Sequence, residues 1–189
     1  EAGKLAGEDM IAVTGGNAHI GMIVSDTDDS AQRLRMEGFL SAINPHKNMI
    51  VEETFESRSD RIRIRKLVSG MLQDNKRINA IFCADQTAAD MLGDILQEEG
   101  YSKNNMKVVC FGMSREIYKY LQDGTYTFSV MNDTVEMGYQ AVKTLKDCIN
   151  GKSGEKRIVY TEIENADKDF DFESWKAERE NRERSCMMS

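Results

Sequence analysis

Two kinds of segment alternate along most of this chain. Five short runs rich in β-branched and apolar residues each end in a polar or small residue, and each is followed by a stretch with helical spacing of its apolar positions. The runs cover residues 19–25, 49–55, 78–84, 107–112 and 127–131. Such alternation predicts parallel strands joined by crossover helices. We therefore expect an α/β fold with a doubly wound, mostly parallel sheet.

The stretches between these runs predict the helices. They are expected over residues 1–13, from the capping residues at 26–30 to about residue 43, and over 60–74, 86–99, 114–122 and 133–150. The last of these has apolar or small residues at +3 and +4 spacing, which indicates one apolar face. A final strand is expected over Arg157–Ile163, and a charge-rich tail over 164–189 with some helix around 173–184.

Charge and composition narrow the class of protein. The chain has 189 residues, a formal net charge of −7 and a sequence pI of about 5.0, which argues against a nucleic-acid footprint. No stretch approaches the roughly 20 apolar residues of a membrane span. The four cysteines form no CxxC pair and predict no disulfide framework, which leans mildly towards a reducing compartment.

A ligand is expected at one edge of the sheet. In open α/β sheets, ligands bind beyond the carboxyl ends of the strands, where helix N-termini also point. Four polar residues stand out there: Arg35, Arg61, Asp85 and Asn132. Each also has a simpler interpretation, as a helix cap or part of a solvated face. No GxxxxGK[ST] or GxSxG motif is present, and neither histidine has an evident catalytic partner.

Five segments carry a resemblance to a known family. They are AGKLAGEDMIA, SAQRLRMEGF, INAIFCADQTAADML, KVVCFG and LQDGTYTFSVMNDTVEMGYQAV. In this order and spacing they resemble the C-terminal lobe of type I periplasmic binding proteins, the family that includes ribose-binding proteins, and the related effector domains of LacI-type repressors. The resemblance implies that residues 1–163 form a ligand-binding lobe. Residues 1–13 would then cross from a missing N-terminal lobe, and 164–189 would form a tail.

The resemblance also implies roles for single residues. Arg35 matches an arginine that hydrogen-bonds sugar hydroxyls, Arg61 matches a second cleft arginine, and Asp85 matches an aspartate that is usually a structural cap. Other positions depart from the family: Ala84 replaces an asparagine, Gly112 a ligand-binding aspartate, Asn132 a glutamine, and Ser59 stands where an aromatic ring often stacks on the sugar. The ligand-binding positions expected from sequence are Arg35, Ser59, Arg61, Asp85, Gly112 and Asn132.

These departures bear on the kind of ligand. Sugar sites pair hydroxyls with carboxylates and amides, and cover the sugar face with an apolar ring. Two arginines without nearby carboxylates would make the site more positive, which favours an anionic sugar-like ligand.

The resemblance implies binding of a small sugar-like solute by closure of two lobes, with no catalysis, metal or cofactor. The partners expected are the missing lobe and an ABC permease or a sensor kinase, in a periplasmic or extracytoplasmic location. A cytoplasmic LacI-type effector lobe is the alternative, and an enzyme on a flavodoxin-like sheet is a third. The sequence leaves open whether the chain forms a homodimer.

Overall fold

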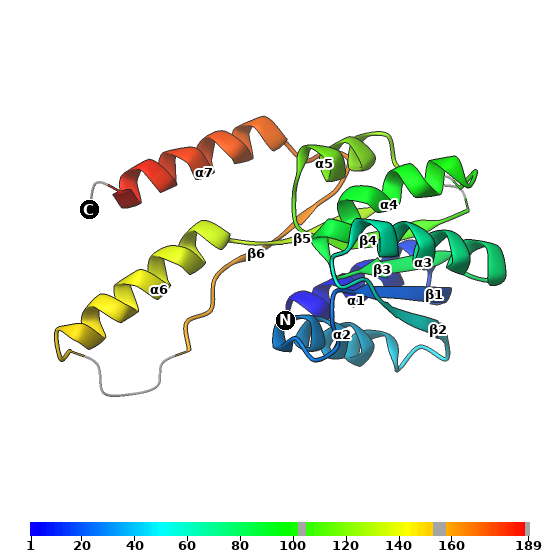
Figure 1. Cartoon of the computed structure of the whole chain (residues 1–189), viewed down its shortest axis with the longest axis horizontal. Helices are drawn as coiled ribbons and strands as arrows, with labels where there is room; N and C mark the ends of the chain where they lie inside the picture. The colour runs from blue at the N-terminus through cyan, green and yellow to red at the C-terminus, as the bar shows by residue number, and fades with distance from the viewer. Residues whose placement is uncertain (102–104, 153–157, 188–189) are drawn as a thin grey trace. The chain divides into compact units, whose positions relative to one another are not determined.

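The computed structural model describes residues 1–101, 105–152 and 158–187. Helices and strands follow one another as expected from the sequence (Figure 1). In chain order they are α1 (Ala2–Thr14), β1 (Asn17–Val24), α2 (Ser30–Ile43), β2 (Asn48–Glu56), α3 (Arg61–Asp74), β3 (Ala80–Cys83), α4 (Gln86–Glu98), β4 (Lys107–Phe111), α5 (Arg115–Gln122), β5 (Phe128–Asn132), α6 (Thr134–Ile149), β6 (Ile163–Ala166) and α7 (Phe172–Met187).

The strands form one sheet in the order β2-β1-β3-β4-β5-β6. Pairing is parallel between β1 and β2, β1 and β3, β3 and β4, and β4 and β5. Helices α1 and α2 pack together on one face of the sheet, and α3 and α4 cover the other (Figure 1). The predicted α/β class with a mostly parallel, doubly wound sheet is confirmed.

Aromatic rings form the centre of the core behind the carboxyl ends of β3 and β4. The rings of Phe39 and Phe82 stack with their centroids 4.1 Å apart, and Phe82 meets Phe111 edge to face at 5.9 Å. All three side chains are buried. Phe39 comes from α2 and the other two from the strands, so the core fixes α2 over these strand ends.

Glycines let α1 and α2 approach each other closely. A Cβ atom on Gly7 would lie 2.6 Å from Cβ of Ala42, and one on Gly3 would lie 1.9 Å from the carbonyl oxygen of Arg35. Neither distance is compatible with a side chain. The small residues of α1 therefore pack against the backbone of α2 at Arg35, the arginine that the sequence predicts to bind the ligand.

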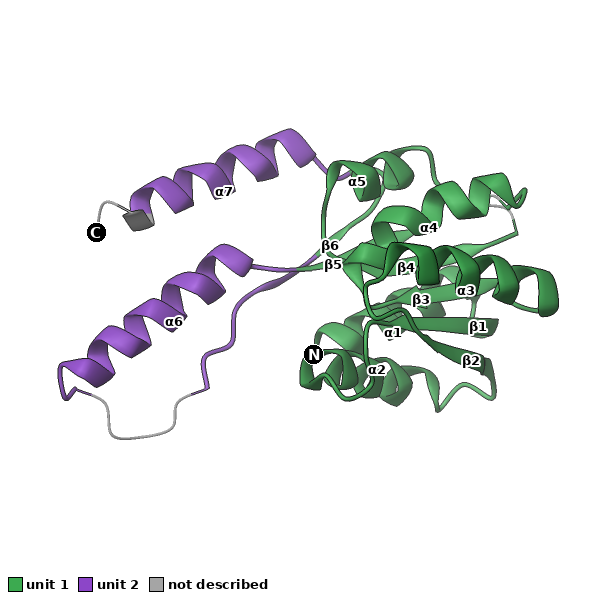
Figure 2. Cartoon of the chain, viewed as in Figure 1, with its two compact units in different colours: residues 1–131, 165–169 green, residues 132–164, 170–189 purple. Residues whose placement is uncertain are grey.

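The chain divides into two compact units (Figure 2). The first contains residues 1–131 and 165–169, and the second contains 132–164 and 170–189. In the second unit Asp133 accepts hydrogen bonds from Nη1 of Arg179 at 3.3 Å and from Nη1 of Arg182 at 2.6 Å. The guanidinium of Arg179 also lies 4.5 Å from the ring centroid of Trp175. These contacts hold α7 to the start of α6.

The end of the chain differs from the prediction in two respects. The strand expected over 157–163 is instead β6 at Ile163–Ala166, and residue 157 lies outside the described residues. The side chains of Ile158 and Tyr160 are exposed. A strand there would need a partner for its backbone groups. The helix expected around 173–184 is longer and extends through most of the predicted tail, as α7.

Candidate functional site

The guanidinium of Arg35 is held at the carboxyl ends of β3 and β4. Its Nη1 donates to the carbonyl oxygen of Ala84 at 2.9 Å, and its Cζ lies 4.6 Å from the ring centroid of Phe111. Burial lowers the pKa of Arg35, and the carboxylates of Asp29 and Asp85 act in the opposite direction. The group remains a cation at neutral pH. One of its five N–H donors is used by Ala84, so this edge of the sheet presents an oriented cation with further donors.

Gln32 lies one helical turn before Arg35 and contacts the same strand end. Its Nε2 donates to the carbonyl oxygen of Ala84 at 3.3 Å, and its Oε1 accepts from the backbone N–H of Ser25 at 3.3 Å. The first turn of α2 therefore links the ends of β1 and β3 through one amide side chain.

Asp85 organises the neighbouring loop. It caps α4, and its Oδ1 accepts from the N–H of Thr87 at 3.0 Å. The hydroxyl of Ser57 donates to Oδ2 of this buried carboxylate, and that of Ser59 donates to Oδ1 at 3.2 Å. Arg58 and Ser59 have positive φ angles of 52° and 51°. The hydroxyl of Ser59 is thus committed to Asp85, which fills the structural cap role that the resemblance implies.

Gly112 follows β4 with a φ of +94°, a conformation that favours glycine. Its N–H donates to the carbonyl oxygen of Val130 at 3.0 Å. A Cβ atom here would lie 2.6 Å from Oε1 of Gln86. An aspartate at this position would therefore be strained and would have to displace Gln86, so the departure from the family at residue 112 has a steric reason.

The remaining two predicted residues belong to other elements, the start of α3 and the end of β5. Arg61 is exposed in the first turn of α3. Burial raises the pKa of Asp90, while a hydrogen bond from Ser114 at 2.6 Å and the charge of Arg61 act to lower it. Asn132 is half-buried, ends β5 and is the first residue of the second unit. The structure therefore gathers Arg35, Ser59, Asp85 and Gly112 around the ends of β3 and β4.

The expectation of two arginines without nearby carboxylates is wrong. Asp29 and Asp85 act electrostatically on Arg35, and Arg61 acts on Asp90. Single positions of the family motif do not predict the carboxylates that the starts of the helices bring to this edge.

Three polar residues of this edge were not singled out from sequence: Gln32, Ser57 and Gln86. Gln32 could have been found from its position three residues before Arg35, which places both on one helix face. Gln86 could have been found because it begins α4 directly after the capping Asp85. Ser57 carried no such signal, since its contact depends on the positive φ angles of the two residues after it.

No group of three or more His, Cys, Asp or Glu residues within the described ranges could hold a metal ion. Cys83 and Cys110 are both buried and paired in register on adjacent strands, and burial raises the pKa of the Cys110 thiol to about 12. Both are inert core thiols. Of the helices described, none is long and apolar enough to cross a membrane.

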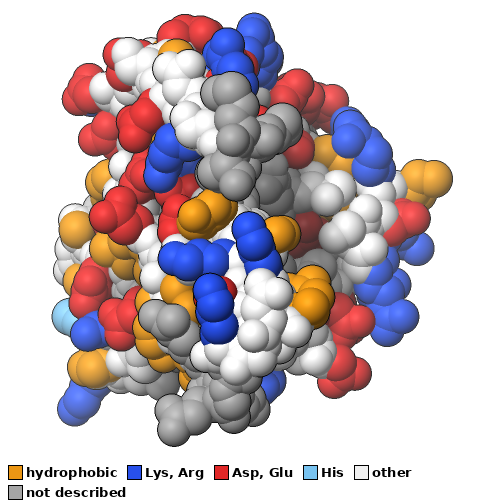
Figure 3. Space-filling view, turned by 90° about the vertical axis from the view of Figure 1, so that its left-hand side faces the viewer, with side chains coloured by type: hydrophobic (Ala, Val, Ile, Leu, Met, Phe, Trp, Pro, Cys, Tyr) orange, Lys and Arg blue, Asp and Glu red, His pale blue; other side chains and the backbone are white. Residues whose placement is uncertain are grey.

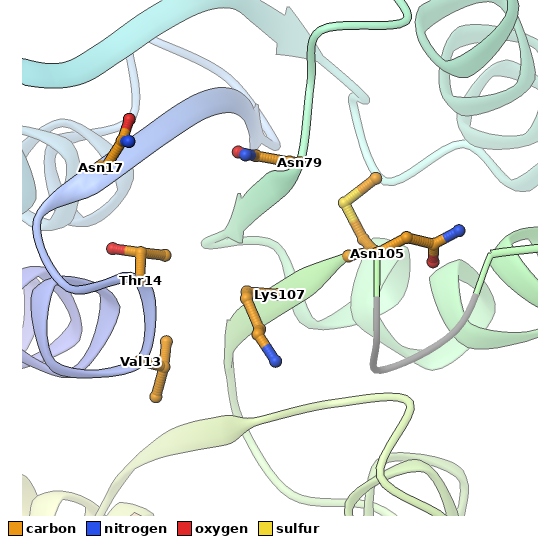
Figure 4. Close-up of a pocket in the computed structure, with 7 residues that line it drawn as sticks. Val13, Thr14, Asn17, Asn79, Asn105 and Lys107 are labelled. Carbon is orange, nitrogen blue, oxygen red and sulfur yellow. The ribbon is translucent and has the colours of Figure 1, made fainter.

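A hollow of about 320 Å³ lies at the opposite edge of the sheet, beside the amino ends of β1, β3 and β4 (Figure 4). Two of its polar side chains form hydrogen bonds within the fold. The Oδ1 of Asn79 accepts from the N–H of His19 at 2.9 Å, and the hydroxyl of Thr14 donates to the carbonyl oxygen of Met10 at 2.6 Å. This hollow is therefore separate from the edge at which an α/β sheet binds ligands.

A parallel α/β unit with a cation and an amide fixed at the carboxyl edge of its sheet has the architecture of a ligand-binding lobe. Residues 1–153 match the family described as "Periplasmic binding protein domain". The chain belongs to this family, and the resemblance seen in the sequence is confirmed.

Similar proteins agree with this assignment. The ribose import binding protein RbsB of Escherichia coli is 24% identical over 151 residues, which are 79% of this chain and 50% of RbsB. GanP, a glucose-galactose binding protein from Geobacillus stearothermophilus, is 26% identical, with a TM-score of 0.83 over 88% of this chain and 59% of GanP. The XylFII-LytSN complex matches with a TM-score of 0.80 and 24% identity, over 88% of this chain and 59% of the matched chain. This chain spans about half the length of these relatives.

Proposed function

We propose that this chain supplies one lobe of a solute-binding protein that closes with a second lobe around a small sugar-like molecule. The observation that carries the proposal is Arg35, which is fixed by Ala84 and Phe111 and retains donors for a ligand. Family membership and the sugars named for RbsB and GanP support the same class of ligand. Hinge closure would bring the second set of contacts.

The surface of α6 supports the existence of a second lobe. The side chains of Val142, Leu145 and Ile149 recur on this helix and are 68%, 61% and 76% exposed. An apolar helix face of this kind normally packs on a sheet. In the view of Figure 3, hydrophobic side chains reach the surface between charged ones. We infer that this apolar face of α6 packs on the second lobe.

The charges near the site favour a neutral, hydroxyl-rich ligand over an anion. Asp29 and Asp85 oppose the charge of Arg35, and Asp90 opposes that of Arg61. An anion would have to approach these carboxylates, whereas a neutral sugar needs only donors and acceptors in fixed positions. A carboxylated or phosphorylated sugar is the second candidate ligand, because an arginine such as Arg35 can form a bidentate pair with a carboxylate or a phosphate.

The bound form would serve import or sensing outside the cytoplasm. RbsB is an import binding protein, and the structure of XylFII with LytSN shows that a similar chain assembles with another protein. We favour delivery to an ABC permease and keep a sensor kinase as the second partner. A LacI-type effector lobe would share this fold. A helix-turn-helix segment upstream would identify a repressor, and a signal sequence would identify an exported protein.

Isothermal titration of the full-length protein tests the proposal. The titrants are D-ribose, D-glucose, D-galactose and D-arabinose as neutral sugars, and ribose 5-phosphate and glucuronate as anionic ones. We expect saturable binding of at least one neutral sugar. Binding confined to the anionic compounds would overturn the neutral assignment, and no binding of any compound would overturn the sugar-binding proposal.

A further inference from the structure

Gln86 lies in the place where a side chain at position 112 would otherwise stand. It is the first residue of α4, and its Oε1 and Cδ would lie 2.6 and 2.7 Å from a Cβ on Gly112. Because Gly112 has no side chain and a φ of +94°, the end of β4 offers only backbone here. The polar group above this strand end therefore comes from the neighbouring helix.

The Gln86 amide is available for a ligand. The side chain is exposed, and within the described parts of the chain its amide has no hydrogen-bond partner. Gln32 at the same edge is different, since both ends of its amide bond to the backbone of strand ends. Of these two amides, Gln86 is thus the one that keeps an acceptor and two donors free.

Gln86 and Arg35 lie over two consecutive residues at the end of β4. The guanidinium of Arg35 covers the ring of Phe111, and Gln86 covers Gly112, the next residue. Arginine can only donate hydrogen bonds, so a ligand hydroxyl that donates needs an acceptor nearby. The amide oxygen of Gln86 supplies that acceptor without adding a negative charge.

We propose that Gln86 is a specificity-determining residue of this lobe, whose amide pairs with a hydroxyl of a neutral sugar beside the group bound by Arg35. This proposal rests on the proposed function and adds the residue that selects hydroxyls. The proposal also accounts for the missing carboxylate at position 112, because the Gln86 amide on α4 supplies the acceptor that a side chain at the end of β4 would otherwise supply.

The test compares three substitutions of Gln86 in the full-length protein by calorimetry with the neutral sugar that binds best among the four named above. Gln86→Met keeps the length of the side chain over Gly112 and removes the hydrogen bonds. Gln86→Ala removes both the side-chain length and the hydrogen bonds, and Gln86→Glu keeps a hydrogen-bond acceptor. Gln73→Met, at the far end of α3, is the matched control, since the exposed amide of Gln73 donates to Glu99.

We expect Met and Ala at position 86 to weaken binding by about 10-fold or more, Glu to retain most of the affinity, and the control to bind like the wild type. Equal affinity of the Met variant and the wild type would overturn the role of the amide, even if the wild type binds sugar in the proposed way. If the wild type binds none of the sugars, the proposed function fails and this inference fails with it. Circular dichroism and thermal unfolding of each variant separate loss of binding from loss of fold.

Discussion

Arg35 on α2 donates a hydrogen bond from Nη1 to the carbonyl oxygen of Ala84, the residue that follows β3, over 2.9 Å. This bond ties a helix on one face of the sheet to the end of a strand in its middle. It also fixes the guanidinium over Phe111, so the cation is oriented before any ligand arrives. A preorganised donor loses less conformational entropy on binding than a free side chain does.

The carboxylate of Asp85 should contribute more to stability than an ordinary helix cap. Asp85→Ala removes the cap of α4 and leaves the buried hydroxyl of Ser57 without its acceptor. We expect a loss of about 2–4 kcal/mol in the free energy of unfolding, from the sum of a cap and an unsatisfied buried group. Urea denaturation measures it. Asp29→Ala removes an exposed cap, on α2, together with a charge that acts on Arg35, and should cost about 1 kcal/mol; equal losses in the two variants would contradict the network.

The same substitution should have opposite effects at two helical glycines. Gly7→Ala places a methyl group 2.6 Å from Cβ of Ala42, so it should destabilise the protein by about 1–3 kcal/mol through overpacking. Gly70→Ala in α3 meets nothing within 4 Å and should stabilise it by about 0.5–1 kcal/mol. Thermal unfolding of the two variants decides the matter. A stabilising Gly7→Ala would show that α1 and α2 are not in close contact.

The attachment of α7 should depend on pH. Burial alone would raise the pKa of Asp133, but a backbone N–H from Glu136 and the charges of Arg179 and Arg182 outweigh it, so the net pKa lies below its ordinary value. A carboxyl with a depressed folded-state pKa stabilises above its unfolded-state pKa, about 3.9, and loses this contribution as the pH falls through the folded-state value.

Hydrogen exchange of α7 measures this dependence. We expect protection to be constant from pH 7 to 5 and to decrease below about pH 4. In Asp133→Asn the contribution of the charge is absent at every pH, so the curve should be flat across this range. Wild-type protection that stays unchanged down to pH 3 would contradict the role of the ion pairs.

The exposed face of α6 should cause this chain to self-associate when it is isolated. Val142 and Leu145 are both more than half exposed on one helix face, and apolar surface of this kind promotes association. Sedimentation equilibrium of residues 1–189 should show dimers or larger species, and Val142→Glu combined with Leu145→Glu should restore a monomer. Ile62→Glu, at an exposed apolar residue of α3, is the control. A monomeric wild-type chain would contradict this expectation.

The sequence predicted the parallel sheet because its signals are local. Each β-branched run and each capping residue, such as Asp29, Asp60 and Asp85, acts within a few residues of its own position. The boundary of β6 was not predicted, because Ile158–Tyr160 has the composition of a strand and pairing with a neighbour is a property of the fold.

The residues of the candidate site were predicted only in part, because contacts between different strand ends are a property of the fold and give no local signal in the sequence. Arg35 could be found from a motif within one helix. The contact of Gln86 with Gly112 joins residues from different strand ends. It depends on a positive φ angle, which a glycine in the sequence allows but does not by itself predict. The balance of charge around the two arginines likewise depends on carboxylates from other helices.

The most direct test of the central claim is the affinity of Arg35→Ala for the neutral sugar that the full-length protein binds. A hydrogen bond to a charged group contributes about 1.5–3 kcal/mol, so we predict a dissociation constant that is about 10- to 150-fold higher. Arg33→Ala is the matched control, because Arg33 is exposed and pairs with Glu37, so its loss should leave the affinity unchanged. An Arg35→Ala protein that is folded and binds the sugar as tightly as the wild type would contradict the account.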